Sequence, residues 1–333
     1  MSRNKTNCLK DLNAALHSAF EDNDNVILIG EDLFDPYGGA FKVTAGLSTK
    51  FPDRVHSSPI SEAAITGIGI GSAMRGQKVI VEIMFGDFIT LAFDQIVNHA
   101  AKFPYIYGKY LNIPIVIRTP MGGYRGYGPT HSQSLEKYLL GIPGITVVAI
   151  NHFFSPGQLL LNAIDANKPV IFVENKILYP MKVGMNSDKL NIKTTDDYFP
   201  CTILCNNNEI EKTDVSIISY GGISKIIELL MVEMANEEIW IDCMFVTEIS
   251  NIELTCYLIE NLKSENLLFI EEGTEKFNWS SGIIAELAKK NDNNGYQYFN
   301  ISAMDYIIPA SLDAELEVLP SLENIKNQVM EIL

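Results

Sequence analysis

The chain of 333 residues is long enough for about two domains with separate cores, which excludes a small disulfide-stapled module. Apolar residues make up 47% and charged residues 20% of the chain, which excludes wholesale disorder and a membrane bundle. The formal net charge of −16 repels phosphate backbones and anionic lipids, so neither nucleic acid nor a membrane is an expected partner.

The N-terminal residues are polar and lead into Leu9, Leu12 and Leu16 at helical spacing. We therefore expect a helix here, and neither an export signal nor a membrane anchor. The five cysteines are an odd and scattered set, which favours reduced thiols and a cytoplasmic location. Cys201 and Cys205 lack a second pair at zinc-finger spacing, so we do not expect a zinc site.

The first half of the chain alternates short β-rich apolar runs with helical patterns, which predicts an α/β fold with a mostly parallel sheet. The expected strands are Val26–Ile29, Val79–Met84, Ile113–Arg118, Ile145–Ile150 and Val170–Glu174.

A polar stretch with weak periodicity follows, and the strand–helix alternation then resumes. We expect a first domain over residues 1–185, a linker over 186–213 and a second, smaller α/β domain over 214–333. The expected strands of the second domain are Val215–Tyr220, Ile239–Val246 and Leu267–Ile270, with helices near 222–236, 252–263 and 279–290.

The last thirty residues carry six acidic residues and one basic residue. This pattern is typical of a solvated closing helix. An acidic docking face for a basic partner is the alternative.

Glu62 is a single carboxylate in a run of small and apolar residues, Ser58 to Ala73. One interpretation is an acid in the first turn of a helix, where it complements the helix dipole after Pro59. The other is a buried carboxyl that contacts a ring nitrogen of a ligand. The nearby glycines Gly67, Gly69 and Gly71 lack the dinucleotide spacing and a preceding strand. We expect Gly67 and Gly71 to allow close approach of a helix or a ligand.

The segment Glu82–Phe88 follows a predicted strand and combines acidic and aromatic residues around Gly86. Because ligands collect at the carboxyl ends of parallel strands, this segment is a candidate pocket wall. Phe85 and Phe88 as plain core residues are the alternative.

A glycine-rich segment, Gly122–Ser134, follows the third predicted strand and contains His131. Thr130 and Gln133 have the spacing of a capping box, which predicts a helix that starts here. A histidine at that helix N-terminus would be neutral and able to exchange a proton, because the positive dipole end disfavours imidazolium. Catalysis and simple capping are both open.

Taken together, these segments resemble the β subunit of the thiamine-diphosphate-dependent 2-oxo acid dehydrogenase E1 component, a relative of transketolase. The motifs are Ser58–Glu62, Ala73–Gly76 leading to Val81–Phe85, Asp94–Asn98 with Ala100–Lys102, Gly122–Gly123, and His131–Ser134 before Pro143–Gly144. Weaker matches in the second half are Ser219–Gly222, Glu271–Gly273 and Leu319–Ser321.

The resemblance implies a pyrimidine-binding domain followed by a transketolase C-terminal-like domain, in an α2β2 heterotetramer. It implies that Glu62 hydrogen-bonds N1′ of the aminopyrimidine and promotes the tautomer that removes the C2 proton. It also implies that Phe88 packs on the pyrimidine, that Met84 lines the same wall, and that His131 takes part in acyl transfer to lipoamide.

In this family the α subunit holds the diphosphate and Mg²⁺ through Gly-Asp-Gly and a later Asn, a motif that this chain lacks. The resemblance also implies a structural K⁺ bound by backbone carbonyls. The matching positions are Ile115, Ala163, Ile164, Ala166 and Lys168.

The leading hypothesis is therefore an E1 β subunit that needs an α subunit to decarboxylate a small 2-oxo acid and pass the acyl group to lipoamide, with a lipoyl E2 acyltransferase as a further partner. A two-subunit transferase that passes an acyl or two-carbon unit to a carbon acceptor is the alternative. A regulatory paralogue without turnover is disfavoured by the presence of Glu62 and Phe88.

Overall fold

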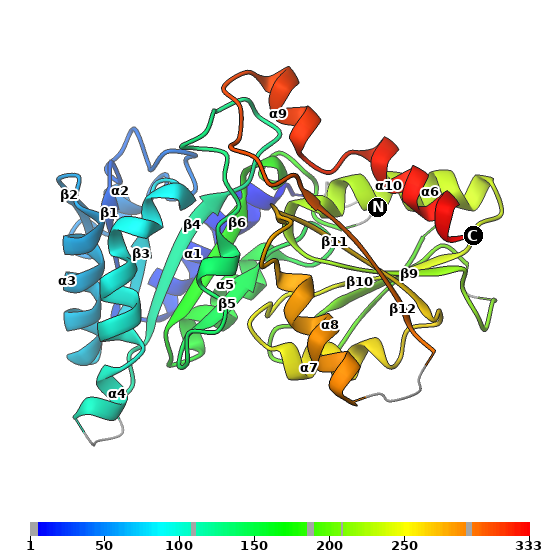
Figure 1. The fold of residues 1–333 in the computed structure, drawn as a ribbon. Helices are drawn as coiled ribbons and strands as arrows, with labels where there is room; N and C mark the ends of the chain where they lie inside the picture. The colour runs from blue at the N-terminus through cyan, green and yellow to red at the C-terminus, as the bar shows by residue number, and fades with distance from the viewer. Residues whose placement is uncertain (1–5, 108–110, 185–189, 208, 291–294) are drawn as a thin grey trace. The chain divides into compact units, whose positions relative to one another are not determined.

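The structure is a computed structural model that describes residues 6–107, 111–184, 190–207, 209–290 and 295–333. The backbone divides into two compact units (Figure 1). Unit 1 holds the described residues of the ranges Met1–Met121, Gly141–Val148 and Ser155–Val183. Unit 2 holds those of Gly122–Leu140, Ala149–Phe154 and Gly184–Leu333. The chain thus enters unit 2 twice before residue 184, in addition to the crossing expected near residue 185.

Unit 1 contains a sheet whose six described strands have the order β2-β1-β3-β4-β6-β5. Their bounds are β1 Val26–Glu31, β2 Val55–Ser58, β3 Lys78–Glu82, β4 Ile115–Met121, β5 Thr146–Ala149 and β6 Val170–Asn175. The pairs β1–β2, β1–β3, β3–β4 and β4–β6 are parallel, which confirms the predicted parallel sheet. Every residue of β1, β4 and β6 is buried, as expected for strands covered on both faces.

Helices cover both faces of this sheet (Figure 1). Helix α3 (Glu62–Met74) lies on one face, and α1 (Cys8–Asp22) packs with α5 (Pro156–Asp165) on the other. The expected N-terminal helix is confirmed as α1, whose first turn is capped by the Asn7 side chain on the Lys10 amide at 2.9 Å. Two short helices, α2 (Leu47–Lys50) and α4 (Phe103–Ile106), complete the unit.

Unit 2 contains a second sheet whose six described strands have the order β12-β11-β9-β10-β8-β7. The strands are β7 Asn191–Thr194, β8 Thr202–Cys205, β9 Val215–Ser219, β10 Ile241–Phe245, β11 Asn266–Thr274 and β12 Gln297–Ala303. Strands β12, β11, β9 and β10 pair in parallel, whereas β8 and β7 add an antiparallel edge. The stretch 186–213, expected as a linker, thus contributes two strands. Every residue of β7 is exposed, which accounts for the polar sequence of that strand.

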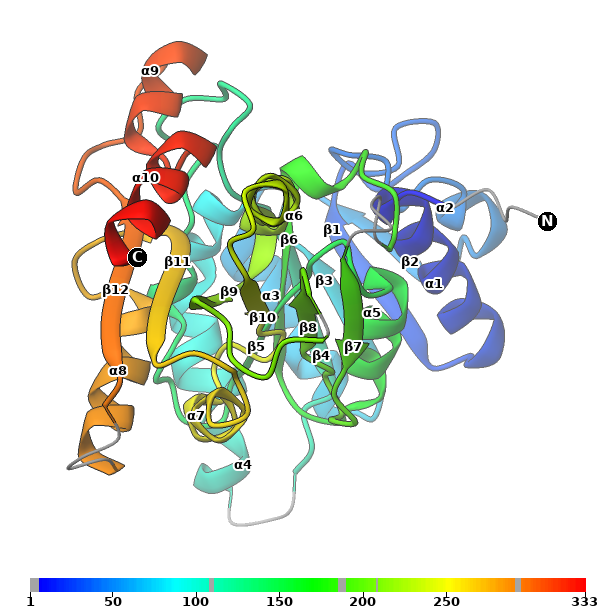
Figure 2. The ribbon, with the colours of Figure 1, turned by 90° about the vertical axis from the view of Figure 1, so that its right-hand side faces the viewer.

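The helices of unit 2 lie on both faces of its sheet. Helices α6 (Ser224–Asn236) and α10 (Leu322–Ile332) pack together on one face, and α7 (Ile252–Ile259) and α8 (Trp279–Lys290) on the other (Figures 1 and 2). The C-terminal segment therefore does form closing helices, α9 (Leu312–Val318) and α10, and α10 buries Ile325 and Val329 in the core. Glu315 on α9 is fully buried and so does not belong to a solvated face.

None of the helices in the described residues combines the length and the apolar run that a membrane crossing requires. All five cysteines are free and buried. Burial raises the pKa of the Cys8 thiol to about 12 and that of Cys201 to about 11, so these thiols are unreactive near neutral pH.

Candidate functional site

Glu62 is the first residue of α3 and follows the carboxyl end of β2. It is only 5% exposed, although acidic residues in a first helical turn usually face solvent. Its position therefore agrees with both interpretations of the sequence, an acid in the first turn of a helix and a buried carboxyl. The burial is what a ligand-binding carboxyl requires.

Glu31, the last residue of β1, forms a carboxyl pair with Glu62. It is also 5% exposed, and its Oε1 accepts a hydrogen bond from the Ser61 amide at 3.2 Å. Burial, followed by the Glu62 charge, raises the pKa of Glu31. Glu31 was not among the residues predicted from the sequence, because its partners Ser61 and Glu62 lie in a distant segment.

Met84 and Phe88 lie beyond the carboxyl end of β3, and both are only partly buried. The Phe88 ring meets the Phe85 ring edge to face at 6.2 Å, and Phe85 meets Phe41 in the same way at 5.5 Å. Gly86 is required here because a Cβ would overlap the Met121 side chain. The segment is thus an aromatic wall that stays only partly buried, which is compatible with a flat aromatic ligand.

Behind this wall lies a buried ionic network in unit 1. Arg118 of β4 donates to both oxygens of Glu174 at 2.8 and 2.7 Å, and also to Glu82 of β3. The Tyr179 hydroxyl donates to Glu174 at 2.8 Å. Because Glu174 already pairs with Arg118, burial dominates at Glu82 and raises its pKa to about 7. Sequence reasoning missed this network because its members come from four separate segments.

Replacing Glu82 by Gln should weaken the pH dependence of stability. The folded chain keeps the Glu82 proton up to about pH 7, whereas an unfolded glutamate releases it near about pH 4.3. The stabilisation is therefore complete below about pH 4.3, declines as pH rises, and is lost above about pH 7, a total of ~4 kcal/mol. We expect urea unfolding at pH 5 and pH 7.5 to show a smaller difference for Glu82→Gln than for wild type.

The matched control is Asp53→Asn, the same amide replacement at an exposed carboxyl of unit 1. An unchanged difference in Glu82→Gln would contradict the assignment of a neutral, buried Glu82.

The glycines of α3 allow close approach at one of the two expected positions and at Gly69 as well. A Cβ on Gly69 would come within 2.7 Å of the Val81 side chain, so this glycine lets α3 pack closely on β3. A Cβ on Gly67 would lie 3.1 Å from Gln95 Oε1, tighter than an ordinary contact, so the close approach expected at Gly67 is confirmed. The one expected at Gly71 is wrong, because a Cβ there would meet nothing within 4 Å.

His131 belongs to unit 2 and lies in the loop Gly122–Gln133. The predicted helix at Thr130 is wrong, because the segment forms turns and the next element is one 3₁₀ turn, Glu136–Tyr138. The Gln133 carbonyl instead accepts a hydrogen bond from Gly122 at 3.1 Å, which draws the chain away from a helical start. The Thr130 hydroxyl lies 3.0 Å from His131 Nδ1. The helix-dipole argument for a neutral ring therefore does not apply.

The five positions implied for K⁺ all lie in unit 1. Ile115 begins β4, Ala163 and Ile164 lie in the last turn of α5, Ala166 is its C-cap, and Lys168 is exposed before β6. The Ala163 carbonyl already accepts from the Ala166 amide at 3.3 Å. The implied K⁺ ligands are backbone carbonyls, which every residue carries, so the side chains at these positions do not test the site. K⁺ binding at these five positions stays a prediction.

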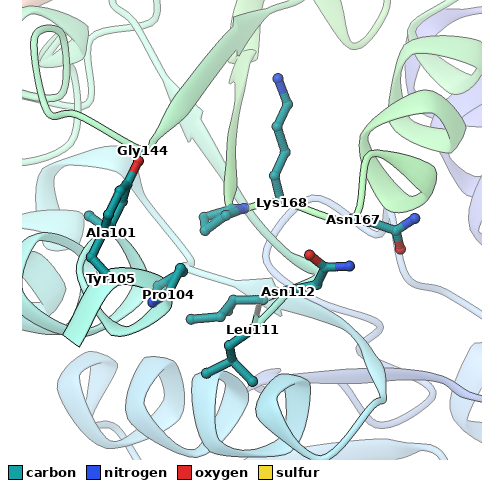
Figure 3. A pocket seen from close by; sticks show the side chains of 10 residues that line it. Ala101, Pro104, Tyr105, Leu111, Asn112, Gly144, Asn167 and Lys168 are labelled. Atoms are coloured by element: carbon teal, nitrogen blue, oxygen red, sulfur yellow. The ribbon is translucent and has the colours of Figure 1, made fainter. Parts of the chain in front are cut away.

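A surface cavity of about 520 Å³ lies at the amino-terminal ends of three strands of the first sheet. Its lining includes Ile113, Gly144 and Pro169, which precede β4, β5 and β6. In Figure 3 the Lys168 side chain extends away from Leu111 and Asn112. Ligands of parallel sheets bind at the carboxyl ends of the strands, so this cavity is separate from the candidate site.

The candidate site in unit 1 therefore consists of the carboxyl pair Glu31 and Glu62 and the wall of Met84 and Phe88. A dry carboxyl and an aromatic wall fit an aromatic heterocycle with a basic ring nitrogen. Among the residues that the structure describes, no group of three or more His, Cys, Asp or Glu side chains is placed to hold a metal ion.

The relatives found by comparison with known proteins agree with one another. Residues 5–182 match the family model of the transketolase pyrimidine-binding domain. The chain is 31% identical to the mitochondrial pyruvate dehydrogenase E1 component subunit beta-1 of Arabidopsis thaliana, covering 94% of this chain and 85% of the relative. It is also 31% identical to the acetoin:2,6-dichlorophenolindophenol oxidoreductase subunit beta of Bacillus subtilis, covering 97% and 95%.

Among solved structures, a split-gene transketolase described as an inactive beta4 tetramer superposes with a TM-score of 0.72. The match covers 98% of both chains at 15% identity, and it confirms the fold.

Proposed function

Because this chain belongs to the family of β subunits of thiamine-diphosphate-dependent 2-oxo acid dehydrogenase E1 components, we propose that it decarboxylates a small 2-oxo acid together with an α subunit and passes the acyl group to lipoamide. The observation that carries the proposal is the buried carboxyl pair of Glu31 and Glu62 beside the carboxyl ends of β1 and β2.

When bound, thiamine diphosphate would supply the carbon that stabilises the electrons released on decarboxylation. Glu62 would hold a proton at N1′ of its aminopyrimidine ring. Beside it, burial and the Glu62 charge raise the pKa of Glu31, which favours the protonated form of that carboxyl. Met84 and Phe88 would pack on the ring and keep water from it, which strengthens the hydrogen bond between the carboxyl and the ring.

We propose that the α subunit supplies the ligands for the diphosphate and Mg²⁺. This chain has Gly86-Asp87-Phe88 where a Gly-Asp-Gly motif would require a second glycine. The α2β2 assembly, the lipoyl E2 partner and the cytoplasmic location remain predictions. A pull-down with a lipoyl E2 acyltransferase tests the E2 partner.

The isolated chain should not bind thiamine diphosphate measurably, because the charged end of the cofactor has no anchor in it. Titration calorimetry with thiamine diphosphate and Mg²⁺ should show no heat of binding to the purified chain. The same titration of the chain assembled with its α subunit should show saturable binding that depends on Mg²⁺. Tight, Mg²⁺-dependent binding by the chain alone would contradict the division of the cofactor site between two subunits.

Reconstitution with the α subunit tests the function itself. We expect decarboxylation of a 2-oxo acid with an artificial electron acceptor, and acyl transfer when lipoamide replaces that acceptor. Transfer to an added aldehyde in place of lipoamide would support the carbon-acceptor transferase instead. An assembled, cofactor-loaded complex that turns over none of a panel of 2-oxo acids would overturn the proposal.

A further inference from the structure

The loop that carries His131 has an unusual backbone within unit 2. Four of its residues have positive φ, Gly122 (90°), Tyr124 (64°), Gly126 (68°) and Gly128 (81°). Positive φ is strained for Tyr124, since it carries a Cβ. The described residues between the end of β4 and the 3₁₀ turn at Glu136 form neither a helix nor a strand. The shape of the loop therefore depends on contacts made by other parts of unit 2.

Two buried carboxylates make these contacts. Glu315 of α9, fully buried, accepts from the Arg125 amide with Oε1 and from the Ser132 hydroxyl with Oε2, each at 3.4 Å. Glu272 of β11, 6% exposed, accepts a short hydrogen bond from the Gly123 amide. Glu315 thus joins both sides of the loop, and one of its partners is the residue directly after His131.

The packing around Glu315 is close. A Cβ on Gly123 would lie 2.7 Å from Glu315 Oε1 and 2.6 Å from Leu319 Cδ1, so this position requires glycine. The Tyr124 hydroxyl donates to the Pro320 carbonyl at 2.9 Å. In Figure 1, α9 lies beside this loop, more than 180 residues from it in the sequence. The C-terminal segment therefore adds contacts to the hydrogen bonds that the loop makes within itself and with β11.

We propose that Glu315 is a positioning residue for His131. Its carboxylate fixes the loop at Arg125 and Ser132 and so sets where the imidazole lies. The proposal rests on the proposed transfer to lipoamide and on the resemblance, which implies that His131 takes part in that transfer. Loss of a buried acceptor shared by two donors frees both sides of the loop, because each donor then lacks its partner.

The test is Glu315→Met, which keeps the side-chain length and removes both acceptor oxygens. Glu315→Gln is the conservative variant, which keeps one acceptor oxygen and covers the case in which the Met variant fails to fold. The matched control is Glu317→Met, the same change at an exposed position of the same helix. All variants are studied assembled with the α subunit.

The first measurement does not depend on activity. We expect hydrogen exchange of the amides of 122–133 to be about tenfold faster in Glu315→Met and intermediate in Glu315→Gln. Trypsin should cleave after Arg125 more readily in the same order, since this residue is exposed. Exchange and cleavage equal to those of Glu317→Met would overturn the proposal, whatever the activity.

The second measurement separates positioning from general destabilisation. We expect transfer to lipoamide to fall about 10- to 100-fold in Glu315→Met while turnover with an artificial acceptor persists. A mobile loop with equal losses in both assays, or with no loss, would overturn a positioning role. If His131→Ala leaves transfer to lipoamide intact, the proposed function of His131 fails, and the exchange data still decide whether Glu315 holds the loop.

Discussion

Replacing Glu62 by Gln should lower the turnover of the assembled enzyme by about 10²- to 10⁴-fold, the usual range for a general acid–base group. An amide has the shape of the carboxyl but cannot take or give the proton at a ring nitrogen. Assembly and fold should stay intact, because Gln remains compatible with the first turn of α3. The measurement is steady-state decarboxylation with an artificial acceptor at saturating cofactor.

Two comparisons make this result specific. Asp53→Asn, at an exposed carboxyl of unit 1, should run at the wild-type rate. Equal thermal midpoints of Glu62→Gln and wild type would show that the loss lies in the chemistry. Turnover of Glu62→Gln close to wild type would leave Glu62 as a carboxylate that only complements the N-terminus of α3.

The sequence predicts the strands that are buried on both faces, since such strands are continuous apolar runs. It does not predict β12, because Gln297–Ala303 pairs on one side only and most of its residues are partly exposed. For the same reason the fully exposed β7 is part of a stretch that was expected to be a linker. Edge strands receive their hydrogen bonds from a neighbour, and single-chain periodicity does not record that neighbour.

Some residues of the candidate site could be predicted from the sequence and others could not. Glu62 stands out in the sequence because its neighbours along the chain are small and apolar. Glu31 and the partners of Arg118 do not stand out, because the environment that makes them special comes from other strands. A sequence window records local polarity but not the carboxyl group of a distant segment.

The loop that carries His131 is where the structure predicted from local sequence differs most from the observed one. Thr130 and Gln133 have the spacing of a capping box, but the pattern indicates a helix only if the backbone is free to form one. Here Gly122 and Gln133 pair across the loop, and Glu315 binds Arg125 and Ser132 from the C-terminal segment. Tertiary contacts therefore determine a conformation that local chemistry alone does not favour.

Replacing His131 by Ala should strongly reduce transfer to lipoamide, by about 10²-fold or more, while decarboxylation with an artificial acceptor persists. The first step depends on Glu62, whereas the acyl acceptor needs a group that can give a proton to a thiolate or take one from a thiol. The fold should not change, because the hydrogen bonds of Gly122, Arg125 and Ser132, which hold the loop, do not involve the imidazole. The measurement is the ratio of the two rates in one preparation.

His56→Ala, at an exposed histidine of unit 1, is the matched control and should leave both rates unchanged. Equal losses in both assays of His131→Ala at an unchanged thermal midpoint would place His131 in decarboxylation or in cofactor positioning. An unaffected lipoamide reaction would remove the argument for lipoamide that is built on this residue. The carbon-acceptor transferase would then be the better hypothesis, and its acceptor would be selected by the exposed Arg125 and Tyr127 of the same loop.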